Sequence, residues 1–130
     1  MEGTTDVAGK TQKKGGSVFF ETPSINDGAY EFVIPPAMDG WNLTWVRSKA
    51  GTGPSGGPVT IQFRKGLTDM LSTALTIDNG DDDSIDAAAQ PVIDTANDDV
   101  ATGDTVSIDF DAVNDSENVL VAFEFTGEVD

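Results

Sequence analysis

The chain has 130 residues, 7 basic and 23 acidic side chains, a formal net charge of −16, and neither histidine nor cysteine. The length predicts one domain with its own core. The missing residue types exclude disulfides and thiolate chemistry and remove the most frequent general base and metal ligand. The negative charge argues against partners such as nucleic acid or anionic membranes, because phosphate contacts need cationic side chains.

Residues 1–16 are predicted to be a polar arm, followed by one domain over residues 17–130. The arm holds three of the seven basic residues, Lys10, Lys13 and Lys14. Because the rest of the chain carries nearly all the acidic residues, we expect these lysines to bind a partner. Backbone pairing at a neighbouring sheet edge and contacts with a negative surface are the two ways to hold such an arm. An inert leader is the alternative.

From Ser17 onward, apolar residues alternate with polar ones, which is the pattern of half-buried β-strands. Clusters of Gly, Pro, Asn and Asp separate the runs, and helical periodicity is lacking. We therefore predict an all-β fold, a two-sheet sandwich of about eight strands. A jelly roll is the favoured topology, with other Greek-key sandwiches as alternatives. The predicted strands centre on residues 18–20, 30–34, 41–45, 59–63, 71–77, 92–93, 106–110 and 119–125.

The alternation also predicts which side chains lie between the two sheets. Trp41 and Trp45 are an even number of positions apart in their run, so their side chains are predicted to point to the same face of that strand, the buried one. The loop of Gly, Pro and Ser at 51–58 is predicted to be a flexible connection at one end of the sandwich. The six side chains that we expect to be buried are Phe32, Trp45, Ile61, Leu75, Ile108 and Phe123.

The loop from Asp78 to Asp86 is the most acidic stretch and the obvious candidate for a calcium site. Calcium takes six to eight oxygen ligands, which carboxylates can supply. However, the spacing of Asp81, Asp82 and Asp83 does not fit the twelve-residue calcium loop. A solvated turn, in which Asp and Asn side chains bond to their own backbone, is the favoured interpretation. We expect no metal and no cofactor.

No catalytic residues are predicted either. Paired carboxylates could hydrolyse glycosides, but among 23 acidic residues such pairs arise by chance. No Gly-x-Ser-x-Gly occurs in the strand-turn-helix context that serine hydrolases need, because helical periodicity is lacking. The Gly-rich run at 51–57 lacks the lysine of a phosphate-binding loop. We therefore expect that the protein is not an enzyme.

The segment DMLSTALTID at 69–78 resembles a recurrent block of tailed-bacteriophage virion proteins. The resemblance continues through PVID at 91–94 and VATGD at 100–104 to Ile108 and Asp109, and more loosely it spans residues 30–125. In that family a similar block lies in small jelly-roll-like β-domains of capsid decoration proteins, head fibres and tail-fibre tips. The run of three aspartates at 81–83 departs from the family pattern, which carries no catalytic residues.

The resemblance implies a structural protein of the virion. A short arm before one compact domain favours a decoration (cement) protein that binds the major capsid protein on the outer surface of the head. Because threefold positions of such a shell suit three copies, we expect a homotrimer. The alternative is a tail or fibre-tip protein that binds a host receptor or glycan. A third possibility is a secreted carbohydrate-binding sandwich, which would require Trp41 or Trp45 to be exposed on a sheet face.

Overall fold

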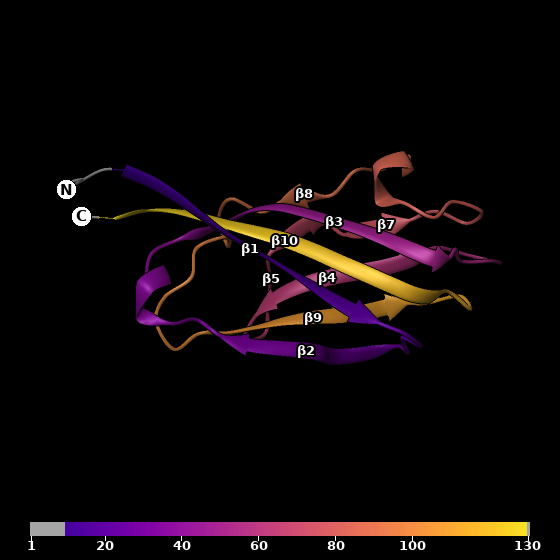
Figure 1. Cartoon of the computed structure of the whole chain (residues 1–130), viewed down its shortest axis with the longest axis horizontal. Coiled ribbons are helices and arrows are strands. Elements are labelled where there is room, and N and C mark those ends of the chain that lie inside the picture. Colours follow the sequence, from indigo (N-terminus) through magenta and orange to yellow (C-terminus); the bar gives the residue numbers. More distant parts are fainter. Residues whose placement is uncertain (1–9, 130) are drawn as a thin grey trace.

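The computed structural model describes residues 10–129 and contains ten β-strands but no α-helix within them (Figure 1). The all-β prediction is therefore confirmed. Within this range, no helix is long and apolar enough to cross a membrane. The strands are β1 (Lys10–Phe20), β2 (Asn26–Val33), β3 (Asn42–Thr52), β4 (Val59–Lys65), β5 (Thr68–Asp69), β6 (Leu71–Thr73), β7 (Leu75–Ile77), β8 (Val92–Ile93), β9 (Thr105–Ala112) and β10 (Glu117–Val129), with 3-10 helices η1 (Pro36–Met38) and η2 (Ser84–Asp86).

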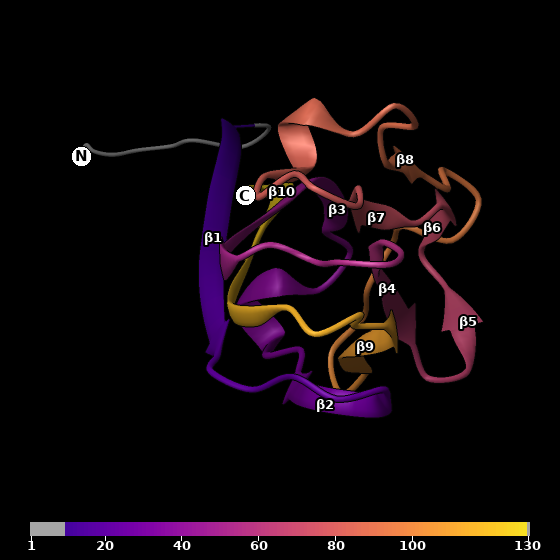
Figure 2. The ribbon, with the colours of Figure 1, turned by 90° about the vertical axis from the view of Figure 1, so that its right-hand side faces the viewer.

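Two antiparallel sheets face each other across the core (Figure 2). The first, called sheet A here, has the order β1-β10-β3, and the second, sheet B, has the order β2-β9-β4, with β5 and β7 both paired to β4. The chain alternates between the sheets over its first four strands and again at β9 and β10. The jelly-roll topology stays a prediction, because among the described residues no regular fourth strand completes sheet A. The outer edge of β3 is met there by two isolated bridges, to Asp83 and Asp99.

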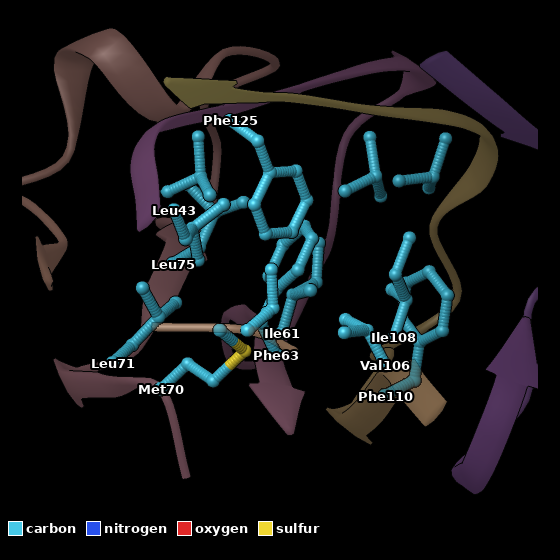
Figure 3. Packing of buried hydrophobic residues seen from close by; sticks show 14 of the residues in the cluster. Leu43, Ile61, Phe63, Met70, Leu71, Leu75, Val106, Ile108, Phe110 and Phe125 are labelled. Carbon is cyan, nitrogen blue, oxygen red and sulfur yellow. The ribbon is translucent and has the colours of Figure 1, made fainter. Parts of the chain in front are cut away.

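The core lies between the two sheets and follows the period-two pattern of the sequence. Ile61, Leu75 and Ile108 are fully buried, as predicted. Phe32 and Phe123 are half-buried, and their rings stack across the gap between the sheets with centroids 5.3 Å apart. Figure 3 shows the labelled core side chains, which come from strands of both sheets and, at Met70 and Leu71, from the segment that follows β5. Burial of this apolar surface is the main favourable term for folding.

The prediction that Trp45 is buried is wrong: its side chain is 46% exposed, whereas that of Trp41 is 5% exposed. A β-bulge explains the difference. Glu124 and Phe125 of β10 pair with Trp45 and Leu43, so Thr44 is an extra residue in β3. One extra residue reverses the side-chain parity of a strand. Trp45 therefore lies on the outer face of sheet A.

Strand β1 begins well before the predicted boundary between arm and domain. From Lys10 to Phe20 it pairs residue by residue with β10, from Val129 back to Val119. The predicted division at residues 16 and 17 thus falls inside one strand, and removal of residues 2–16 would remove seven of its eleven residues. Backbone pairing, which needs no apolar alternation, forms the polar half of this strand. The rest of the predicted arm, residues 1–9, lies outside the described residues.

The single strand predicted over residues 71–77 is broken at Ala74. Its first part, β6, pairs with β8, and its second part, β7, pairs with β4 through Ile61 and Leu75. Both parts still bury their apolar side chains, because Leu71, Leu75 and Ile77 are at most 2% exposed. With Asp69, which belongs to β5 and pairs with Arg64, the segment with the family resemblance contributes to three different ladders.

Candidate functional site

The acidic loop at 78–86 is bound to the body of the sandwich by its backbone and by ion pairs with β3. The amide of Ala50 donates to the carbonyl of Asp82 at 2.8 Å, and the amide of Gly80 donates to the carbonyl of Pro54 at 3.1 Å. A Cβ on Gly53 would collide with the carbonyl oxygen of Asp81. The Gly/Pro loop predicted to be a flexible connection is thus in direct contact with the acidic loop.

The shortest of these ion pairs joins Arg47 on β3 to Asp83, and Lys49 on the same strand lies 3.9 Å from a carboxylate oxygen of both Asp82 and Asp83. The guanidinium donates from Nε at 3.2 Å and from Nη2 at 2.7 Å to the two carboxylate oxygens of Asp83, whose side chain is 10% exposed. The hydrogen bond from Arg47 holds the pKa of Asp83 below its usual value. Asp83 also accepts from the amide of Ile85 at 3.1 Å and so caps η2.

These contacts occupy carboxylates that a metal ion would need. Asp78 accepts from the amide of Ala88 at 2.9 Å, and Asn79 accepts from the amide of Gly56 at 3.0 Å. Among residues 10–129, no group of three or more acidic side chains is placed to hold a metal ion. The loop meets the edge of β3 through the bridge between Lys49 and Asp83, and this part of it is more tightly held than the solvated turn that we predicted.

A group of charged residues that the sequence did not single out lies on the face of sheet B away from the core. Asp109 is buried there and accepts from the amide of Gly28 at 2.6 Å, and Arg64 lies 3.8 Å from its second oxygen. Burial, and secondarily the charge of Asp109, raise the pKa of Asp111. Such pKa shifts accompany many catalytic sites but also structural charge networks. Since Asp109 holds the backbone at Gly28, its contact is structural.

The predicted partner-binding lysines lie on β1, which is an edge strand of sheet A. Lys13 pairs in register with Thr126 and Lys14 with Phe125, and both side chains are exposed. Lys10 begins the strand, opposite Val129. The structure therefore places all three lysines on one strand, spaced along a sheet edge, rather than on a detached arm.

Beside Lys14 lies an apolar groove of about 250 Å³ at the open side of the sandwich, between β1 and β2. Its floor and walls include the half-buried rings of Phe32 and Phe123, and its rim includes the exposed Tyr30. Gly16 also lines the groove, and its lack of a side chain lets the Phe123 ring lie against β1: a Cβ there would lie 2.8 Å from Cζ of Phe123. The sequence gave no indication of this groove, since its residues come from four separate segments.

The outer face of sheet A has a second feature, centred on Trp45. Two hollows of about 240 and 120 Å³ are lined by Trp45, one reaching Ile93 and the other reaching Ile85. The exposed apolar side chains of Ile85 and Val92 come from the same covering segment. The signal that could have revealed this face is the three-residue spacing between the buried Leu43 and Val46, which is typical of a bulge.

A further hollow, of about 460 Å³, lies beside the turn between β9 and β10. Asn114 and Asp115 in that turn have positive φ values of 49° and 63°, which these residue types tolerate in tight turns. Its lining consists of polar backbone groups and loop side chains, and it contains no acidic side chain beside a basic one. We assign no chemistry to it.

No protein-family model matches the chain, and no curated protein or solved structure matches it either.

Proposed function

We propose that this protein is a structural component of a tailed-bacteriophage virion, a decoration protein on the outer surface of the head whose partner is the major capsid protein. The observation that carries the proposal is the place of the resembling block in the fold. Its apolar residues Leu71, Leu75 and Ile108 are at most 2% exposed. Core residues determine how a domain folds, so a block whose shared residues form the core indicates the same kind of β-domain. The resemblance of this block to virion β-domains therefore supports a virion function for this chain.

The surface of the domain fits a binding role better than a catalytic one. The apolar groove and the surface around Trp45 have no nucleophile beside a general base, which covalent catalysis needs. Basic residues lie along a sheet edge that no other strand of residues 10–129 pairs with, in a strongly acidic molecule. We propose that the protein has no enzymatic activity and attaches by surface contacts, with three copies around each threefold position of the shell.

The test uses heads of the virus that encodes this chain, assembled without the protein. Purified protein should co-sediment with these heads, saturate in multiples of three, and raise the temperature at which the heads release their contents. Gel densitometry gives the copy number and calorimetry gives the release temperature. Failure to bind at micromolar concentration would contradict the proposal, and saturation at one copy per site would contradict the trimer.

A second candidate is supported by the exposed Trp45: a tail or fibre-tip protein, or a secreted sandwich, that binds a glycan. An aromatic ring on a flat sheet face can stack against the apolar face of a pyranose, and the hollows beside it give room for neighbouring rings. Gln90 adds a polar group to this surface. Its Nε2 donates to the carbonyls of Ser84 and Ala87 at 3.1 and 2.8 Å. Its side-chain oxygen is thereby fixed in orientation.

The glycan candidate predicts a change in tryptophan fluorescence on titration with a bacterial surface polysaccharide that a glycan array selects. The signal should survive Trp41→Phe, since Trp41 is 5% exposed, and should disappear with Trp45→Ala. The loss of one aromatic stacking contact should weaken binding at least tenfold. Array signals that are unchanged in Trp45→Ala would exclude this surface as the glycan site.

A further inference from the structure

Strand β1 has a long free edge. Within the described chain it pairs with β10 alone, so over its eleven residues alternate backbone groups face away from the sheet. The other edge of sheet A, at β3, is met by the segment that contains Asp83 and Asp99. An uncovered edge of this length is a template for pairing with another extended segment.

The charge of this edge is opposite to that of the molecule. Lys13 and Lys14 are exposed, and among the described residues neither forms a salt bridge, whereas the cationic side chains of β3 and β4 all do so. With Lys10, three of the seven basic residues lie on this one strand in a chain of net charge −16. An acidic segment would find its complementary charge here and repulsion almost everywhere else.

The groove provides the third element of a docking site. It opens beside Gly16 in the middle of β1 and has a volume of about 250 Å³, which is room for one large side chain. Its walls are the rings of Phe32 and Phe123, and Lys14 and Tyr30 lie at its opening. A strand that pairs with a sheet edge gains affinity from backbone bonds and specificity from a pocket for a side chain.

We propose that β1 is the attachment strand of this protein. An extended acidic segment of the shell protein adds to the free edge of β1 as a fourth strand of sheet A and inserts one large apolar side chain into the groove beside Gly16. The proposal rests on the function proposed above and names the surface and the chemistry of the partner. It requires neither the Trp45 face nor the acidic loop.

The experiment measures binding of the full chain to heads assembled without it, using two pairs of matched variants. Lys14→Glu reverses a charge on β1, and Lys49→Glu makes the same change on β3, where the side chain is 58% exposed. Tyr30→Ala removes the exposed ring at the groove, and Val33→Ala truncates a 63% exposed side chain on the same strand. Thermal unfolding of each variant verifies that it folds.

We expect Lys14→Glu and Tyr30→Ala each to weaken binding at least tenfold, and their controls to change it less than twofold. Hydrogen exchange of the bound protein should show new protection of β1 amides, since the added strand accepts hydrogen bonds from them. Binding without β1 protection and without an effect of either variant overturns this inference and leaves the proposed function intact. No binding of the unaltered protein overturns the proposed function, and the inference fails with it.

A second copy of the chain is the competing occupant of the edge. Sedimentation velocity of the free protein over a hundredfold concentration range should show no association that depends on β1. A dimer in which β1 amides become protected, and which Lys14→Glu dissociates, would overturn the assignment of this edge to the shell protein.

Discussion

Leu75→Ala should lower the free energy of unfolding by about 2–5 kcal/mol, the range for removal of a fully buried leucine side chain. Leu75 is 0% exposed and lies in the same buried cluster as Leu43 and Ile61 (Figure 3). The loss has two parts, the transfer free energy of the methyl and methylene groups and the cavity that remains where β7 cannot move inward. A domain of this size has about 5–15 kcal/mol of stability in total, so the effect is large.

The matched control is Leu67→Ala, because Leu67 is 87% exposed between β4 and β5. Only its carbonyl oxygen is engaged, as acceptor from Arg64 at 2.6 Å, and the substitution leaves that group in place. Its effect should stay within about 0.5 kcal/mol. Urea unfolding followed by far-UV circular dichroism measures both variants. Equal midpoints for the two would mean that the resembling block does not form the core.

The alternation of apolar residues predicted the central part of the fold correctly. Ile61 and Ile108 lie in runs where apolar residues occupy every second position, Val59 to Phe63 and Val106 to Phe110, and both side chains are fully buried. In such strands the geometry of the chain and the burial of apolar surface impose the same pattern, so local sequence is sufficient. The all-β architecture followed from these strands and from the turn residues between them.

Trp45 shows where the pattern fails. Over residues 41–45, side chains alternate strictly between the two faces of the strand only if no residue is inserted. The bulge at Thr44 inserts one, and it is stabilised by contacts with β10, more than 70 positions away in the chain. The Thr44 hydroxyl lies 2.8 Å from the Thr126 hydroxyl and 3.3 Å from the carbonyl of Glu124. A local pattern does not contain this information, and the consequence is a tryptophan on the surface.

The candidate binding site was predicted in its charge but not in its shape. The concentration of lysines near the N-terminus is visible in the sequence, whereas the strand that carries them has no apolar alternation before Val18. Its conformation is determined by β10, which pairs with it in register over eleven residues. The groove beside Gly16 likewise needs Phe32 and Phe123 from two other strands. Non-local pairing therefore creates the features that a partner would recognise.

Gly53→Ala should destabilise the domain by roughly 2–3 kcal/mol, the upper part of the usual range for an inserted methyl group that has no space. The added Cβ would collide with the carbonyl oxygen of Asp81, and it would lie 3.1 Å from the carbonyl carbon. These are backbone atoms, so no side-chain rotation can relieve the contact. The acidic loop must move away from β3, and its hydrogen bonds must lengthen or break.

Hydrogen exchange locates that movement, because two amides report on the contact between the loops. Gly80 donates to the carbonyl of Pro54 and Ala50 donates to that of Asp82, at 3.1 and 2.8 Å, and both amides should exchange faster in Gly53→Ala. The control is Gly40→Ala, which has no atom within 4 Å of the new Cβ but has a φ of 79°. It should lose about 1–2 kcal/mol from left-handed strain alone and leave exchange at Gly80 unchanged. Faster exchange at Gly80 in both variants, or in neither, would show that Gly53 does not hold the acidic loop against the sandwich.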